Sequence, residues 1–215
     1  RDSSTSRGLG DVYKRQAYSR AGVAAFTTST GYGIAKYDNP EELSVSDRNN
    51  IGYQYTDCPL YWISVIYLNF AEAKAEMGSL TQDDLNNSIN KLQARAGLPA
   101  MTTTPDADPA NNMGVSNLIW EIRRCRRCEL IMDNWYRYWD LIRWHQLDKL
   151  DSTKYPNTML GANVSNVPDC EEATKNGYID ASDAQIRTYE AKHYFYPIPT
   201  TQLTLNKNMK QNPGW

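Results

Sequence analysis

The chain has 215 residues, of which 40% are hydrophobic, and a formal net charge of −2 at pH 7. This length can bury a real core, and one domain is the simplest organisation. The composition argues against a disordered chain and against a nucleic-acid partner, which would need a dominant basic face. No apolar run reaches the roughly 18–20 residues that a membrane-spanning helix needs, because Ser64 and Asn69 interrupt the nearest run at 61–70.

The first 16 residues, RDSSTSRGLGDVYKRQ, show no helical period and no export signal. We interpret 1–16 as a non-native or disordered leader and assign the remaining residues, 17–215, to one domain. Any export signal would lie outside this sequence.

The aromatic residues are mostly amphipathic. The sequence contains six Trp and fifteen Tyr but only three Phe. These rings combine an apolar face with a polar edge, which suits partly solvated binding surfaces as well as cores. The ratio favours a recognition role without proving one.

The first half of the domain predicts loops followed by two helices. Residues 17–57 should be loops with one short strand in GYGIAKYDNP, at 31–40. Helical spacing then predicts a helix from about Pro59 to Met77, which Gly78 ends. Thr81 should cap a second, antiparallel helix up to Gly97. Its apolar stripe is Leu85, Ile89, Leu92 and Ala96.

The second half predicts two more helices and a long tail. After a loop at 100–114, a third helix should run toward Asn134 and a fourth from about Trp135 to Leu147. The frequent Pro and Gly residues that follow predict an irregular tail draped over the helices. The fold class is therefore mainly α, with long loops, and its helix pairs are weakly similar to tetratricopeptide packing.

The only cysteine motif is a C-x-x-C formed by Cys125 and Cys128. It falls within the third helix, and no second C-x-x-C or His pair completes a zinc site. We expect two small packed residues with no metal or redox role. The Asp-rich loop around Asp106 and Asp108 lacks the Gly and Glu of a calcium loop, so we expect a solvated loop.

The densest charged feature is the segment WYRYWDLIRWHQLDKL. Arg137, Asp140 and Arg143 follow each other at i, i+3 spacing, so the Asp can pair with both guanidinium groups. They form either a sugar or anion platform or a partly buried structural network sealed by aromatic rings. We favour the structural network, and we assign Arg126 and Glu129 to the same kind of network.

Nothing in the sequence indicates catalysis. There is no nucleophile elbow, no phosphate-binding Gly-rich loop and no carboxylate pair typical of a glycosidase. We expect a protein that is not an enzyme and needs no cofactor.

Four blocks, in order, resemble the C-terminal region of the SusD/RagB family. The likeness runs from about Gly31 to Trp215, and the closing pattern of YPIP followed by QNPGW makes it specific. The chain departs from the family pattern at Trp62 and Val65, and at Cys125 and Cys128. The blocks are PLYWISVIYLNFAEAKAEMG, INKLQARAGLP, RRCRRCELIMDNWYRYWDLIRW and YFYPIPTTQLTLNKNMKQNPGW.

The resemblance implies a tetratricopeptide-like helical lipoprotein at the outer membrane of Bacteroidota. Such a protein binds glycans at the cell surface and delivers them to a TonB-dependent SusC-like transporter. Family members are not enzymes, and full-length members are much longer. No ligand-binding residue of the family can be assigned to a position here.

The physics of sugar binding provides a separate set of candidates. A sugar offers a CH face to an aromatic ring and hydroxyl groups to nearby amides. Four tyrosines in Asn-containing loops fit this chemistry, although each is more readily explained by packing of a loop onto a helix. The candidates are Tyr32, Tyr37, Tyr53 and Tyr55. The alternative function is a helical protein-interaction scaffold without glycan affinity.

Overall fold

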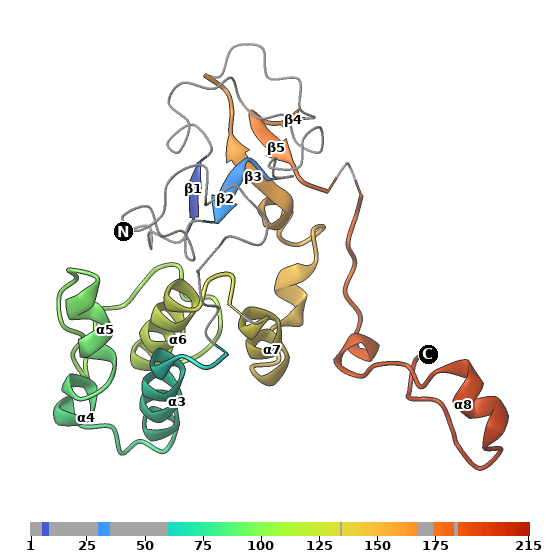
Figure 1. The fold of residues 1–215 in the computed structure, drawn as a ribbon, viewed down its shortest axis with the longest axis horizontal. Coiled ribbons are helices and arrows are strands. Elements are labelled where there is room, and N and C mark those ends of the chain that lie inside the picture. Colours follow the sequence, from blue (N-terminus) through green and yellow to red (C-terminus); the bar gives the residue numbers. More distant parts are fainter. Residues whose placement is uncertain (1–5, 9–29, 35–59, 134, 167–173, 183–184) are drawn as a thin grey trace, which may run out of the picture. The chain divides into compact units, whose positions relative to one another are not determined.

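The computed structural model describes residues 6–8, 30–34, 60–133, 135–166, 174–182 and 185–215. The chain divides into two compact units, each with its own internal contacts. The first contains residues 1–7 and 33–137, and the second contains residues 8–32 and 138–215. The helix-rich class predicted from the sequence is confirmed, because helices dominate the described residues and the strands are few and short (Figure 1).

Helix α3, Ile63–Glu76, forms where the apolar period predicted it. Its predicted start, Pro59, lies outside the described residues. The helix ends as expected, with Met77 at its C-cap and Gly78 at φ +66°, a left-handed conformation that glycine adopts without a Cβ penalty. Leu68 and Ala71 on this helix are completely buried.

The predicted second helix is split into α4, Gln82–Asn86, and α5, Ile89–Arg95. Thr81 caps α4 as predicted: its side chain accepts from Asp84 N–H, and Asp84 in turn accepts from Thr81 N–H. The break follows from side chains that bind helix carbonyls. Asn87 Nδ2 donates to Asp83 O at 3.0 Å and Ser88 Oγ to Asp84 O at 2.6 Å. Such side-chain bonds compete with the continuing backbone pattern.

Helix α6, Asn117–Glu129, and helix α7, Tyr136–Arg143, are both shorter than predicted. Between them, Met132 and Trp135 have φ values of 63° and 59°. Left-handed backbone cannot continue an α-helix, so these residues separate α6 from α7. His145, with φ 53°, likewise prevents α7 from continuing to Leu147, so the apolar period overestimated the length of both helices.

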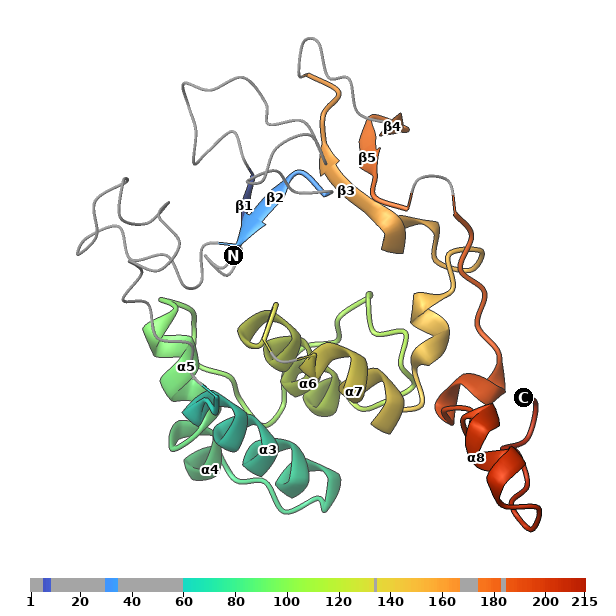
Figure 2. The ribbon, with the colours of Figure 1, turned by 45° about the vertical axis from the view of Figure 1, so that its right-hand side comes forward.

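The core of the first unit joins α3, α4, α5 and α6. Helix α3 packs on α6 and α5 (Figure 2). Every apolar position of the predicted second-helix stripe except Ala96 is buried there, because α4 and α5 keep one face toward α3 and α6. The buried core residues are Leu68, Ala71, Leu85, Ile89, Leu92, Met101, Ile122 and Leu130.

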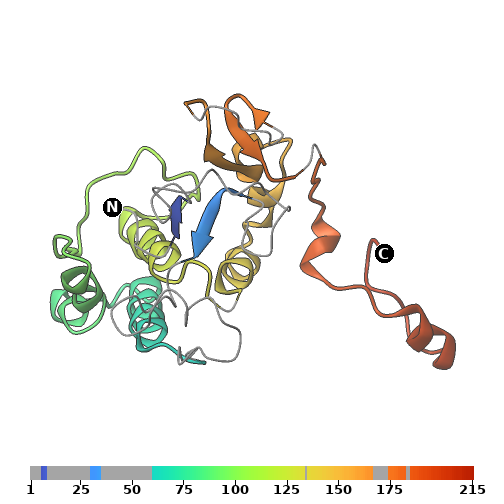
Figure 3. The same cartoon turned by 45° about the horizontal axis from the view of Figure 1, so that its top comes forward.

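The second unit contains a small antiparallel sheet that the sequence did not predict. Strand β5, Tyr178–Asp180, lies between β3, Leu160–Asn163, and β4, Thr174–Lys175 (Figure 3). Ile179 packs with Ala162 and Val164 beneath it. The strands are too short to show an alternating pattern, which is why the sequence predicted an irregular tail instead.

The N-terminal described residues contribute a second sheet. Strand β1, Ser6–Gly8, is hydrogen-bonded to β2, Tyr32–Ile34. Strand β2 falls within the segment GYGIAKYDNP, where one strand was predicted. Strand β1 falls within residues 1–16, whose assignment as a leader stays a prediction.

Short 3-10 turns and one short helix complete the second unit. These are η1, Leu147–Leu150, η2, Pro156–Met159, η3, Ala191–Tyr194, and α8, Thr200–Leu205. The closing segment contacts the region of α7, since Tyr196 and Tyr138 share a hydroxyl–hydroxyl hydrogen bond of 3.2 Å and Tyr194 Oη accepts from Leu147 N–H at 3.3 Å. These bonds fasten the proline-containing tail to α7 and to η1.

Candidate functional site

Arg126 lies in the interior of the first unit. It is 4% exposed, and its Nη1 donates to Asn69 Oδ1 at 2.8 Å. Its guanidinium group lies over the ring of Tyr136, 5.8 Å from the centroid. This is an environment in which the charge is buried, hydrogen-bonded and covered by a ring.

Glu129 forms an ion pair that joins two helices. Both of its carboxylate oxygens accept from Arg95 Nη2 of α5, at 2.6 and 2.7 Å. The pair was not foreseen, because the two residues are 34 positions apart in the sequence.

A further ion pair that the sequence analysis missed joins α6 to α3. Arg123 Nη2 lies 2.9 Å from Glu76 Oε1, and Arg123 Nε lies 3.4 Å from Glu72 Oε1. The two glutamates are one helical turn apart, so one guanidinium group can reach both. The sequence feature that could have predicted this ion pair is the i, i+4 spacing of the two glutamates, together with the Arg-rich composition of α6.

The charged segment of α7 continues into the second unit. Arg143 Nε donates to Asp140 Oδ1 at 2.8 Å, and Asp140 is buried. The guanidinium group of Arg143 lies 4.7 Å from the centroid of Trp144, which is also buried. Arg137, at the end of the first unit, is half-buried. The five predicted network residues are thus divided between the units, with Arg126, Glu129 and Arg137 in one and Asp140 and Arg143 in the other.

Of the four predicted ligand-binding tyrosines, the structure describes one. Tyr32 begins β2 and is exposed. The preceding residues Thr30 and Gly31 lie against β3, since Ala162 N–H donates to Thr30 O at 2.8 Å. Tyr37, Tyr53 and Tyr55 lie outside the described residues. All four stay predictions.

The other sequence motifs have structural surroundings. Burial raises the pKa of the Cys125 thiol to about 12, whereas Cys128 is exposed. Asp108 accepts from Trp120 Nε1 at 3.0 Å and from Ala110 N–H at 2.8 Å, and the bond from Trp120 is the main reason that its pKa lies below the usual range. Within the described ranges, no three His, Cys, Asp or Glu side chains gather as metal ligands would.

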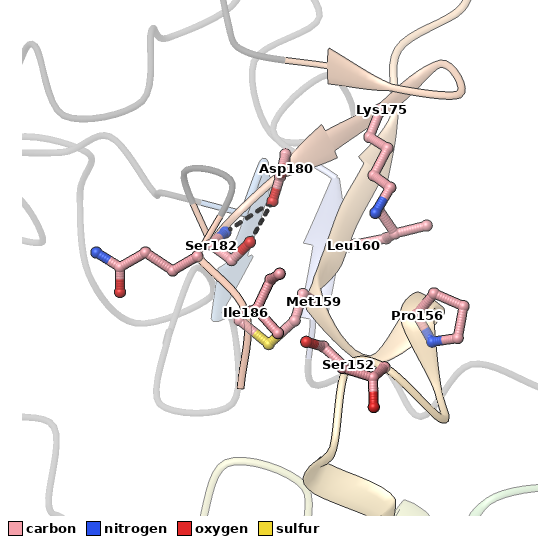
Figure 4. A pocket seen from close by; sticks show the side chains of 10 residues that line it. Ser152, Pro156, Met159, Leu160, Lys175, Asp180, Ser182 and Ile186 are labelled. Carbon is pink, nitrogen blue, oxygen red and sulfur yellow. Dashed lines mark hydrogen bonds between the residues drawn. The ribbon is translucent and has the colours of Figure 1, made fainter. Parts of the chain in front are cut away.

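A pocket of about 190 Å³ lies beside the three-stranded sheet of the second unit (Figure 4). It is smaller than the cavities of roughly 300–1,000 Å³ that hold drug-sized ligands. Polar and apolar side chains both line it: Ser152, Thr153, Pro156, Met159, Leu160, Lys175, Asp180, Ser182, Gln185 and Ile186.

Hydrogen bonds within the protein fix one wall of this pocket. Asp180 Oδ1 accepts from Ser182 N–H at 3.0 Å and from Ser182 Oγ–H at 2.6 Å. Ser152 Oγ accepts from Arg187 N–H at 3.0 Å. The carboxylate and the hydroxyl groups are therefore held in place before any ligand arrives.

No described helix has both the length and the apolar composition to cross a membrane.

The helix-rich fold is that of a helical scaffold protein. The sequence profile of the SusD family matches residues 3–215, and the chain belongs to that family. No curated protein matches the chain. Two of the solved structures with a similar fold are the following.

The first is a SusD-like protein from Bacteroides fragilis, with 24% sequence identity, a TM-score of 0.55 and coverage of 87% of this chain. The second is selenomethionine BT4246, with 25% identity, a TM-score of 0.59 and coverage of 88% of this chain. The matched region spans only 31% and 30% of the two relatives.

Proposed function

We propose that this chain is part of a cell-surface protein that binds oligosaccharides without changing them and delivers them to a TonB-dependent, SusC-like transporter in the outer membrane. Membership of the SusD family across residues 3–215 is the observation that carries this proposal. Proteins of this family are outer-membrane lipoproteins that take part in glycan uptake. The tether would be a lipid anchor outside the 215 residues.

The aromatic composition supports the same proposal. Several Tyr and Trp rings are exposed in the described part of the chain, including Trp135, Trp139, Tyr178 and Tyr196. Exposed rings of this kind stack on the CH faces of sugars. The family match and the composition favour binding over catalysis.

A second candidate function is a helical interaction scaffold of the uptake complex with no glycan affinity of its own. The observation that favours it is an apolar stripe on the exposed side of α3. Ile63, Ile66, Phe70 and Met77 are 64%, 59%, 43% and 69% exposed. Their spacing of three, four and seven residues places them on one helix face, which is typical of a surface that another helix covers.

Affinity electrophoresis of the 215-residue chain in gels that contain neutral polysaccharides separates the two functions. Retardation in at least one gel, relative to a protein of similar charge that binds no sugar, is the expected result. A chain that migrates normally in every gel but co-purifies with the transporter would be the scaffold. Release of reducing ends from the same polysaccharides would contradict both functions, because neither includes hydrolysis.

A further inference from the structure

The register of the three-stranded sheet gathers polar and aromatic side chains on one face. Successive residues of a strand point to opposite faces, so Tyr178 and Asp180 share one face of β5 while Ile179 points to the other. Ile179 is buried against Ala162 and Val164, which identifies its face as the inner one. The face that carries Tyr178 and Asp180 is therefore the outer one.

The neighbouring strands add to the same face. Lys175 of β4 lies directly opposite Tyr178, and Leu160 of β3 lies opposite Asp180. The register of β3 shifts between Leu160 and Asn163, so Ala162 can lie on the inner face although Leu160 lies on the outer one. Residues that face each other across antiparallel strands point to the same side of a sheet. We call the four residues Leu160, Lys175, Tyr178 and Asp180 the outer sheet face.

The pocket opens on this outer sheet face. Leu160, Lys175 and Asp180 all line it, and Figure 4 shows the side chains of these three residues among those that surround the pocket. Tyr178 lies two residues along β5 from Asp180, a separation of about 7 Å along the strand. The aromatic ring of Tyr178 therefore lies close to the pocket.

The polar groups of the pocket differ in what they offer a ligand. Thr153 Oγ1 donates to Asp151, and Ser152 Oγ bonds Arg187, so these hydroxyl groups are used by the fold. Among the described residues, Lys175 forms no side-chain hydrogen bond or ion pair. Its three N–H donors are available to hydroxyl oxygens of a ligand.

We propose that the outer sheet face and its pocket form a saccharide-binding site, in which the pocket holds one sugar residue and Tyr178 stacks on the next residue of the same oligosaccharide. The inference rests on the proposed glycan-binding function and assigns that function a place on this chain. Tyr178 is 37% exposed, which leaves ring surface for a sugar.

The charges indicate a neutral saccharide. One ammonium and one carboxylate flank the pocket, so the local charge sums to zero, and the carboxylate faces any ligand that Lys175 would attract. The Asp180 carboxylate would repel an acidic sugar at short range, and this repulsion would offset the attraction to the Lys175 ammonium group. Hydroxyl groups, in contrast, can accept from Lys175 and donate to Asp180 at the same time.

Mapping by nuclear magnetic resonance tests the site independently of overall binding. The 215-residue chain, labelled with ¹⁵N, is titrated separately with maltohexaose, cellohexaose, xylohexaose, mannohexaose and the acidic hexamer of galacturonic acid. We expect concentration-dependent amide shifts that centre on 175–182 with at least one neutral hexamer. The acidic hexamer should cause smaller shifts there.

Variants then assign the roles. Tyr178→Ala and Lys175→Ala should each weaken saccharide binding at least fivefold. Tyr178→Trp should bind nearly as tightly as the wild type, because it keeps a stacking ring. Tyr61→Ala, which removes an exposed tyrosine from the first unit, is the matched control and should leave the affinity unchanged. Amide spectra of all variants check that the sheet remains folded.

The outcomes separate the site from the function. Shifts that centre elsewhere, with affinity unaffected by the Tyr178 and Lys175 variants, would overturn the site while the glycan-binding function stands. An absence of shifts with all five hexamers would overturn both. Equal or stronger shifts with the acidic hexamer would overturn the preference for a neutral sugar.

Discussion

The side-chain amide of Gln211 binds both backbone groups of Ile198. Its Oε1 accepts from Ile198 N–H at 2.7 Å, and its Nε2 donates to Ile198 O at 2.9 Å. The same Oε1 accepts from Asn212 N–H at 2.9 Å. One side chain thereby joins the YPIP segment to the QNPGW segment, since neither segment forms a strand or helix that would pair their backbones.

Replacement of Gln211 by Glu should open this closure. The carboxylate keeps an acceptor for Ile198 N–H but cannot donate to Ile198 O, so one bond is lost and a carbonyl is left without its partner. We expect a local loss of about 1–2 kcal/mol. Hydrogen exchange at the Ile198 and Asn212 amides measures this local loss of stability. The control is Gln202→Glu, because Gln202 is an exposed residue of α8. Unchanged protection in Gln211→Glu would show that the amide does not hold the tail.

Gly161 should be intolerant of any side chain. A Cβ at this position would lie 2.3 Å from Thr30 O, the same carbonyl that accepts from Ala162 N–H. Gly161→Ala must therefore displace the backbone at 30 from β3. We expect faster hydrogen exchange at the Ala162 amide and a loss of about 1–3 kcal/mol in unfolding free energy.

Gly114→Ala is the comparison for that experiment. Gly114 has φ +67°, and an added methyl group would meet no other part of the protein within 4 Å, so alanine there costs only backbone strain, about 1–2 kcal/mol. The Ala162 amide should keep its protection in this variant. Equal protection in both variants would contradict the close approach of Thr30 to Gly161.

The sequence predicted helices well and distant pairs poorly, for identifiable reasons. Thr81, Gly78 and the apolar stripe of α4 and α5 act through neighbours within a few residues, so their roles can be inferred from spacing alone. Arg95 and Glu129, in contrast, meet only because α5 and α6 pack together. The strands next to the pocket have two to four residues, too few for a period to appear.

The proposed saccharide site illustrates the same limit. Tyr178 and Lys175 are separated by a turn in the sequence, and only the register of β4 and β5 shows that they share a face. The four tyrosines favoured from the sequence were chosen for nearby asparagines, a criterion that cannot detect a sheet face. Ring, ammonium and carboxylate groups become a candidate site only after the chain has folded.

Asp84 should make the stability of the first unit depend on pH. Hydrogen bonds from Lys74 and then from Thr81 lower the pKa of Asp84 from 3.8 to about 2. A carboxylate with a lowered pKa in the folded state stabilises the fold above its unfolded pKa, and that contribution disappears as the pH falls from about 4 toward about 2. Asp84→Asn should therefore be less stable than the wild type at pH 7, and the difference should shrink across that interval.

Urea unfolding at several pH values measures this difference, and the other acidic groups cancel because they are common to both proteins. Asp83→Asn is the matched control, since Asp83 is exposed in the same first turn. It should show a small difference with little change over the same pH interval. A difference for Asp84→Asn that is constant from pH 7 to pH 2 would contradict the role of its carboxylate.

Arg126 should be required for stability rather than for binding. Its buried guanidinium group donates to Asn69 and lies over Tyr136. Arg126→Ala leaves the Asn69 oxygen without this donor and opens a cavity beside the ring, so we expect a loss of about 2–4 kcal/mol in unfolding free energy. Arg127→Ala, at the exposed neighbouring position, should cost less than about 0.5 kcal/mol. Comparable losses in the two variants would show that Arg126 is not a core residue.

The two cysteines of the C-x-x-C motif should react at very different rates. The thiolate is the reactive form, and burial holds the pKa of Cys125 at about 12, whereas Cys128 is exposed on the same helix. Brief treatment of the native chain with iodoacetamide at pH 8, followed by peptide mass spectrometry, should find Cys128 alkylated and Cys125 unmodified. Treatment in urea should modify both, which confirms that the peptides are detectable. Equal modification in the native chain, or a disulfide between the two, would contradict the packed environment of Cys125 and reopen a redox role for the motif.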